Sequence, residues 1–319
     1  MHTTISYSLL LSELRSRRIG LLTRSLAVRV WPFNALMRRR YATRLRSSRR
    51  DNINATARRS FVARPPRLSA SQSTAVGDLK TLGLHQTSFR AFAGSAGDYR
   101  ALRGDIDGLL CEHSLQRQIQ LRKSNQGSKW YVVRALGLEP RKPVPSSVAR
   151  FVLSDEVLNT ANSYLGLQSR LIYLDVWHNL SRDESEPPIS SEFWHRDHED
   201  IRMVKLFLYL TDVNESTGPL EYLCGSQSGG GYASVFPSLS PYGSYPPADK
   251  LQKLIPDQQA RLCTGPAGTL IMWDSSGFHR GGRVLRGARR VLVATFASDA
   301  SVDANRYRLE DPDQYAQLG

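Results

Sequence analysis

The sequence is poor in cysteine, and it has no long uncharged hydrophobic run. Its three cysteines, Cys111, Cys224 and Cys263, are far apart and form no C-x-x-C pair. This spacing indicates neither a disulfide framework nor a thiolate zinc site, and it favours a reducing compartment. No stretch reaches the roughly 18 to 20 apolar residues that a membrane helix needs, because arginines interrupt the hydrophobic segments near the start. We therefore expect no integral membrane span.

Residues 1–69 contain no lysine and only two acidic residues. This segment holds sixteen arginines against Glu13 and Asp51, which accounts for the whole formal net charge of +14 and leaves residues 70–319 neutral. Such a composition resembles an organelle transit peptide, but it also suits a segment that binds an anionic membrane surface or nucleic acid, or a poorly ordered tail. The predicted location is the cytoplasm, with the mitochondrial matrix as the alternative in a eukaryote.

Composition along the chain predicts two parts. A Pro- and Ser-rich stretch at residues 63–73 marks a boundary near residue 70. Residues 1–69 then form a basic leader that is partly disordered or helical, and residues 70–319 form one folded domain. Apolar residues at helical spacing predict helices near 74–82 and 99–110, and a third helix is expected between Ser154 and Gly166.

The remainder of the chain has the pattern of short strands separated by Gly, Pro, Ser and Asn. This pattern predicts a mainly β fold with flanking helices, an antiparallel sandwich or barrel whose core spans about residues 129–298. The long insertion at about 229–259 is interpreted as a lid over one end. The predicted strands are residues 170–180, 203–213, 219–223, 260–264, 268–274 and 290–298.

Two histidines and one aspartate have the spacing of a metal site. His195 and Asp197 stand two apart in FWHRDHED, so both side chains leave the same face if this segment is extended. Far downstream, GPAGTLIMWDSSGFHRGG predicts a strand followed by a turn that presents His279. Two imidazoles and a carboxylate on one face of an octahedral ion form the facial triad of non-haem Fe(II) oxygenases. The sequence therefore predicts Fe(II) bound by these three residues.

With these motifs the chain resembles the phytanoyl-CoA dioxygenase-like family over about residues 75–300. The resemblance is strongest in FWHRDHED, MVKLFLYLTDVNESTGPLEYLCGS and GTLIMWDSSGFHRGG. It implies a double-stranded β-helix, which is a jelly-roll or cupin-like barrel, with His195, Asp197 and His279 as catalytic metal ligands. It also implies 2-oxoglutarate and O2 as cosubstrates, and a dioxygenase that hydroxylates a small molecule, for example a lipid-like or carrier-linked one, with release of succinate and CO2.

Four further residues are predicted to bind the cosubstrate. Arg290 follows His279 at the spacing that the family uses for the arginine that binds the far carboxylate of 2-oxoglutarate, and a guanidinium suits this role because it stays charged when buried. Strand alternation then turns Arg289 the other way. The same alternation groups Lys205 with Phe207, and Tyr173 with the pocket-wall residues Asp175, Trp177 and Asn179. Phe207 follows from the family pattern, while Lys205 is either an anion contact or a lysine that reaches solvent.

Other functions fit parts of the same sequence. Related halogenases replace the triad carboxylate by a small residue, so Asp197 favours hydroxylation. A cupin-like isomerase or hydrolase would share the metal site without using 2-oxoglutarate, and Arg290 is the residue that distinguishes an oxygenase from it. The remaining alternative is a metal-binding protein without oxygenase activity, whose basic leader binds nucleic acid or a membrane surface.

Overall fold

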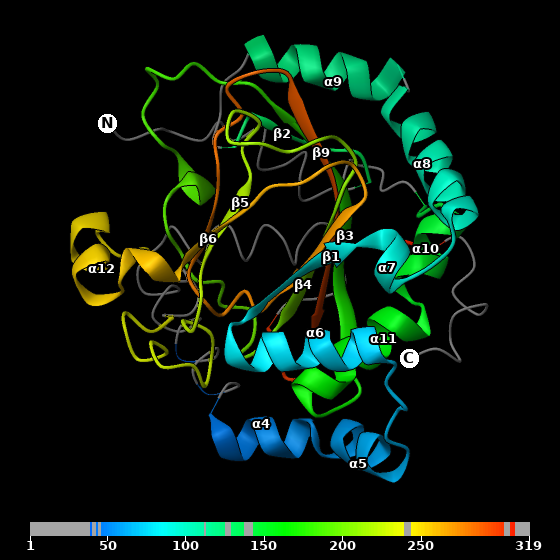
Figure 1. Cartoon of the computed structure of the whole chain (residues 1–319), viewed down its shortest axis with the longest axis vertical. Helices are drawn as coiled ribbons and strands as arrows, with labels where there is room; N and C mark the ends of the chain where they lie inside the picture. Colours follow the sequence, from blue (N-terminus) through cyan, green and yellow to red (C-terminus); the bar gives the residue numbers. More distant parts are fainter. Residues whose placement is uncertain are drawn as a thin grey trace, which may run out of the picture.

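The structure is a computed structural model of the whole chain, shown in Figure 1. It describes residues 39, 43, 46–111, 113–124, 129–136, 143–238, 244–302 and 307–309. Most of the predicted basic leader lies outside the described residues, and so do residues 239–243 of the insertion. Among the described residues, no helix has both the length and the apolar character needed to cross a bilayer.

The described strands form two antiparallel sheets, as the strand pattern predicts. The larger sheet has the order β1-β7-β4-β9-β3-β2, and the smaller has the order β6-β5-β8. The edge strand β1 precedes the predicted core range of 129–298, whereas β3 has the predicted bounds. The strands of the larger sheet are β1 (Leu84–Ser88), β2 (Val132–Arg134), β3 (Arg170–Leu180), β4 (Val204–Tyr209), β7 (Thr269–Trp273) and β9 (Ala288–Ala297). Those of the smaller sheet are β5 (Leu220–Leu223), β6 (Ala260–Cys263) and β8 (His279–Gly281).

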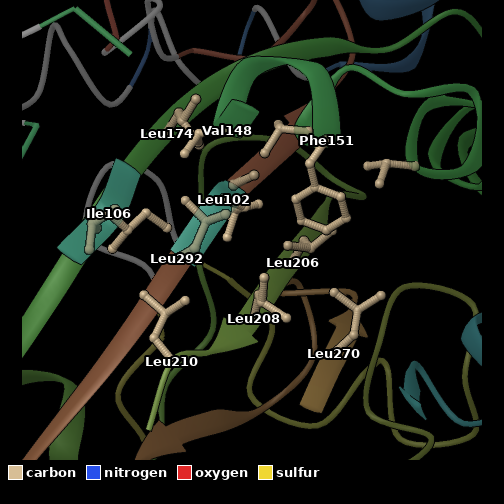
Figure 2. Close-up of a cluster of buried hydrophobic side chains, with 14 of the residues drawn as sticks. Leu102, Ile106, Val148, Phe151, Leu174, Leu206, Leu208, Leu210, Leu270 and Leu292 are labelled. Carbon is tan, nitrogen blue, oxygen red and sulfur yellow. The ribbon is translucent and has the colours of Figure 1, made fainter. Parts of the chain in front are cut away.

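Strand β4 shows how the larger sheet separates two cores. Successive side chains of a strand point to opposite faces. Phe207 and Tyr209 belong to the cluster between the two sheets, together with Tyr222 of β5. Leu206 and Leu208 face the other way, into the cluster that the helices cover (Figure 2). The larger sheet is therefore covered on both faces, by helices on one and by the smaller sheet on the other, which is the jelly-roll arrangement expected from the sequence.

The helices α6, α7, α8, α10 and α11 lie over the outer face of the larger sheet (Figure 1). In Figure 2, Leu102 and Ile106 of α8 and Phe151 of α10 lie against the leucines of the sheet. The helices are α4 (Ser47–Ile53), α5 (Ala55–Ala63), α6 (Ala70–Thr81), α7 (Phe89–Phe92), α8 (Ala96–Cys111), α9 (His113–Ser124), α10 (Ser146–Val152), α11 (Asp155–Leu165) and α12 (Ala248–Leu254).

Local sequence explains where two of these helices begin and end. Helix α6 starts with a capping box in which Ser69 and Gln72 exchange hydrogen bonds. Gly166 takes a left-handed φ of 69° just after α11, a conformation that glycine adopts without strain. Ser154 stands at the predicted N-cap of α11, but its side chain makes no capping hydrogen bond.

Helices α4 and α5 precede the predicted domain boundary near residue 70, yet they pack on the domain. Asn54, between the two helices, is fully buried, and its Oδ1 accepts a hydrogen bond from Ala300 N at 3.0 Å. Arg50 Nε lies 3.5 Å from the buried Asp200 carboxylate. The carbonyl of Ala57 accepts a hydrogen bond from Gln168 N at 3.1 Å. The described end of the leader is therefore tied to the strands by buried polar contacts, and the boundary itself stays a prediction.

Candidate metal centre

Backbone pairing between two distant segments brings the three predicted metal ligands together. His195 N donates to His279 O and His279 N donates to His195 O, both at 3.0 Å, so the two histidines lie directly opposite each other. Their ring centroids are 4.3 Å apart. Asp197 follows on the same face of its extended segment, and its backbone N donates to Ser275 O at 2.9 Å. The sequence prediction that these residues meet in space is confirmed.

Each histidine is oriented by a hydrogen bond to a backbone carbonyl. His195 Nδ1 lies 2.9 Å from Phe193 O, and His279 Nδ1 lies 3.0 Å from Gly277 O. A carbonyl oxygen only accepts, so Nδ1 carries the proton in both rings. The lone pair therefore lies on each Nε2, which faces Asp197: His279 Nε2 is 3.6 Å and His195 Nε2 is 4.0 Å from its carboxylate oxygens.

Burial keeps both imidazoles neutral at physiological pH. It lowers the pKa of His195 to about 4, and burial together with the neighbouring His195 lowers the pKa of His279 to about 3. Burial alone would raise the pKa of Asp197, but the ammonium of Lys205 beside it holds that pKa well below its usual range. Neutral imidazoles and an ionised carboxylate are the protonation states that bind a metal.

These residues fit a divalent metal ion. One ligand atom from each of His195, Asp197 and His279 lies within 4.8 Å of the others. Lys205 Nζ makes an ion pair with Asp197 Oδ2, which leaves Oδ1 available to a metal. Three ligands on one side leave the other coordination positions open, as the facial triad requires. When bound, iron at this site supplies the oxidising chemistry with dioxygen that no protein side chain can provide.

The three residues line a cavity of about 100 Å³ that opens to solvent. Three aromatic side chains form one part of its wall: Phe207 packs edge-on against Trp273 and Trp177, with ring centroids 4.5 and 5.7 Å away. Such apolar walls exclude water and strengthen the few polar contacts that remain. The other described residues that line the cavity are Lys129, Tyr131, Val132, Asn179, Ser191, Lys205, Leu220, Gly281, Gly282 and Arg289.

Arg289 lines the cavity, and the predicted Arg290 does not. On β9, Arg289 lies on the face of Val291 and Val293, which belong to the core between the sheets. Arg290 lies on the opposite face, where its Nε donates to His178 Nδ1 at 3.3 Å. The predicted orientations of the two arginines are therefore wrong, because one residue along a strand exchanges the two faces.

Arg289 is a buried cation whose guanidinium is only partly satisfied. Its Nε and Nη2 lie 3.1 and 3.2 Å from the side-chain oxygen of Asn179, in the amide orientation that satisfies both groups. Its Nη1 is buried and has no hydrogen-bond partner. An unpartnered buried donor is costly, so this nitrogen favours an acceptor that enters the cavity.

Of the other residues predicted to bind the cosubstrate, two line the cavity and one does not. Phe207 and Lys205 line the cavity, while Tyr173 is not among its lining residues. Tyr173 instead supports the wall, because its hydroxyl accepts a hydrogen bond from Trp177 Nε1 at 2.7 Å. Sequence reasoning missed Lys129, Tyr131 and Trp273. Of these three, only Trp273 could have been predicted from the sequence, because strand alternation places it on the face opposite to the residues that face the helices.

The insertion at residues 229–259 lies beside the metal centre, where the lid was expected. Tyr245 stacks on His195, with ring centroids 5.3 Å apart and planes 8° from parallel. Ser238 Oγ donates to the backbone oxygen of Asp197 at 3.1 Å. These contacts place the insertion against the ligand segment, and its action as a lid stays a prediction.

Comparisons with known proteins support the same chemistry. The family model described as phytanoyl-CoA dioxygenase (PhyH) matches residues 148–291, which include the three ligands and Arg289. A search of curated proteins finds no match. Among solved structures, the chain is similar to EctD from S. alaskensis with bound Fe, at 16% identity and a TM-score of 0.51, over 80% of this chain and 86% of that one.

The chain is also similar to the non-heme alpha ketoglutarate dependent epimerase SnoN from nogalamycin biosynthesis. The identity is 14% and the TM-score 0.50, over 72% of this chain and 84% of that one. Likeness at such identities shows the jelly-roll fold, and the family match adds the chemistry. Residues 148–291, which include the His-Asp-His group, match the phytanoyl-CoA dioxygenase (PhyH) family model, and this match indicates a non-haem Fe(II)- and 2-oxoglutarate-dependent oxygenase.

Proposed function

We propose that the chain hydroxylates a small-molecule substrate, with 2-oxoglutarate converted to succinate and CO2. His195, Asp197 and His279 would hold the iron, and 2-oxoglutarate would enter the cavity beside them. The carboxylate of Asp197 favours hydroxylation over halogenation, since it occupies the position that halogenases leave to a halide. The open, partly apolar cavity would hold the substrate next to the metal.

The observation that carries the proposal is the buried, unpartnered Nη1 of Arg289 in the same cavity as the three ligands. A metal-binding protein that did not use 2-oxoglutarate would leave this donor unsatisfied. The far carboxylate of 2-oxoglutarate would accept from Arg289, and the planar guanidinium would fix its direction by paired hydrogen bonds. Asn179 would hold the guanidinium in place from the other side.

Lys205 would keep Asp197 in its binding orientation. Its ion pair holds Asp197 Oδ2, which lies 3.6 Å from His279 Nε2, while Oδ1 lies 4.0 Å from His195 Nε2. Trp177, Phe207 and Trp273 would exclude water from the reacting atoms, so that oxidation is directed to the bound substrate.

Anaerobic addition of Fe(II) and 2-oxoglutarate to the full chain tests the cofactor assignment. The chelate has a weak visible charge-transfer band, which is expected with wild type, absent with Asp197→Ala, and retained with Asp249→Ala, where an exposed aspartate of α12 is removed. Admission of dioxygen should then yield succinate, and incubation with candidate substrates should give products that are one oxygen atom heavier. Well-folded wild-type protein without the band would contradict the proposal.

A further inference from the structure

Arg196 lies between two of the metal ligands, and its side chain leaves the opposite face of their segment. Side chains alternate along an extended segment, so His195 and Asp197 share the face of the metal centre and Arg196 takes the other. Arg196 is buried, and its Cζ lies 3.9 Å from the ring centroid of Phe278. It is not among the described residues that line the cavity. Arg196 therefore acts on the metal centre only through the segments of chain that it holds.

One half of the guanidinium links the two ligand segments. Nη1 of Arg196 donates to Ser276 O at 2.6 Å and also to Ser226 O. Ser276 belongs to the turn that leads into His279, the third ligand. Ser226 follows β5, the strand that pairs with β8 beside His279. The link therefore joins the FWHRDHED segment to the segment of the third ligand, on the face opposite to the metal centre.

The other half of the guanidinium holds the insertion. Nη2 of Arg196 donates to Tyr232 O at 3.1 Å and to Val235 O at 3.0 Å. The backbone of Arg196 also pairs with Ser244: Arg196 N donates to Ser244 O at 3.0 Å, and Ser244 N donates to Arg196 O at 3.3 Å. One residue thus contacts two separate stretches of the insertion. The two terminal nitrogens together donate to four carbonyl groups, which matches the four hydrogens that they carry.

These contacts are what makes a buried guanidinium acceptable at this position. Burial of a charge is costly unless polar groups satisfy it. Four carbonyl groups and the face of Phe278 do so for Arg196, and the carboxylate of Asp274 also favours its charge. Loss of the guanidinium would leave carbonyls of three chain segments without their common donor. The relative position of these segments therefore depends on one side chain.

The pairing with Ser244 places an aromatic ring over a metal ligand. Arg196 and Ser244 are antiparallel partners, so Tyr245 lies opposite His195 and on the same face. The two rings stack, with centroids 5.3 Å apart and planes 8° from parallel. Tyr245 is exposed and His195 is buried, so the ring of Tyr245 covers one face of the ligand.

We propose that Arg196 is a positioning residue of the metal centre, which holds the two ligand segments together and fixes the insertion so that Tyr245 covers His195. This role goes beyond the proposed function. It rests on metal binding by the three ligands, and neither on hydroxylation nor on the use of 2-oxoglutarate. Loss of the guanidinium should therefore loosen the insertion and weaken metal binding together, while the rest of the fold remains intact.

Binding of Co(II) to the full chain, first freed of metal by a chelator, tests the effect on the ligands. Imidazole and carboxylate ligands bind divalent first-row metals, and the visible spectrum of bound Co(II) reports its coordination geometry. Arg196→Met, which removes every donor of this side chain, should raise the dissociation constant of Co(II) at least about tenfold, a difference of about 1.4 kcal/mol, and change the spectrum. Arg261→Met, which removes an exposed arginine of β6 whose carbonyl contacts are local, should bind Co(II) as wild type does.

Hydrogen exchange of the metal-free chain, measured by mass spectrometry of peptides, tests the effect on the insertion. Amide exchange reports local opening of the structure. In Arg196→Met, peptides that cover residues 230–238 and 244–251 should exchange at least about tenfold faster than in wild type. Peptides of α11 should be unchanged, because this helix lies on the other face of the larger sheet. Equal acceleration in both regions would show a general loss of stability and contradict the proposal.

A conservative variant separates the geometry of the guanidinium from its charge. Arg196→Lys keeps the charge but has three N–H donors on a single nitrogen, so it should give intermediate values in both measurements. If Arg196→Met does not fold, Arg196→Lys decides: weaker Co(II) binding with faster exchange in the insertion alone supports the proposal, and wild-type behaviour contradicts it. Unchanged Co(II) binding by a folded Arg196→Met would also overturn it.

The outcomes distinguish this inference from the proposed function. Co(II) binding needs neither 2-oxoglutarate nor dioxygen, so absence of the visible band with Fe(II) and 2-oxoglutarate would refute the cofactor assignment alone. If the wild-type chain does not bind Co(II), the metal centre is wrong and both proposals fail.

Discussion

Replacement of Arg289 should weaken 2-oxoglutarate binding far more than replacement of its neighbour Arg290. Arg289 lines the cavity with a buried, unpartnered Nη1, whereas Arg290 contacts His178 on the opposite face of β9. Arg289→Ala would remove two charge-assisted hydrogen bonds to the far carboxylate, each contributing about 1.5 to 3 kcal/mol. Even the lower value predicts a loss of about 3 kcal/mol.

That loss corresponds to a weakening of more than about 100-fold in the dissociation constant of 2-oxoglutarate. The assay is an anaerobic titration of Fe(II)-loaded protein with 2-oxoglutarate, followed by the visible band. Arg290→Ala is the matched control, with the same charge change one residue away. It should weaken binding less than about threefold, because Arg290 lies on the opposite face of β9 and does not line the cavity. Arg289→Lys should fall between, since an ammonium lacks the paired donors.

A larger effect of Arg290→Ala than of Arg289→Ala would refute the assignment of the two faces of β9. Equal and small effects would show that 2-oxoglutarate does not use this arginine pair. Circular dichroism of each variant separates a binding defect from misfolding, because only the latter changes the far-ultraviolet spectrum.

Three further predictions concern stability and the metal ligands. Asn54→Ala should lower the free energy of unfolding in urea by about 1 to 3 kcal/mol, because it removes a buried hydrogen bond and leaves Ala300 N with only its 3.2 Å contact to Ser298 Oγ. The exposed Asn52→Ala on α4 should have almost no effect. The free energy of unfolding of the metal-free protein should fall by about 2 kcal/mol for each of His195 and His279 when the pH is lowered from about 6.5 to about 5. Histidines of the unfolded chain take up protons over this range. The two buried rings, with pKa values of about 4 and 3, stay neutral. Stability that is constant or rises over this range would contradict the burial of the ligands. Gly277→Ala should weaken metal binding and destabilise the fold, since its Cβ would lie 2.1 Å from Tyr222 Oη, whereas Gly77→Ala, with no atom within 4 Å, should be neutral or stabilising.

Local sequence was sufficient for the parts of this protein that depend on short-range periodicity and on ligand chemistry. Strand β3 has the predicted bounds, 170–180, because alternation and flanking turn residues specify a strand without reference to its neighbours. The candidate ligands His195, Asp197 and His279 were predicted because few side chains bind iron, and because residues two apart on an extended segment share a face.

Contacts between distant segments decided the rest. Both Arg289 and Arg290 follow a turn, and only the pairing of β9 with β3 and β4 determines which of them enters the cavity. Lys129 carries no local signal, since it becomes a wall residue only when the turn before β2 closes beside the metal ligands.

The position of helices α4 and α5 was also decided by contacts between distant segments. Their composition predicted a basic leader that is partly disordered or helical, and the buried contacts of Asn54 and Arg50 hold this helical segment on the domain. Composition reports the average character of a segment, whereas docking depends on a few buried groups that find partners far along the chain. Residue type and spacing thus determined the fold class and the metal ligands, and long-range strand register and packing decided which charged side chains face the cavity.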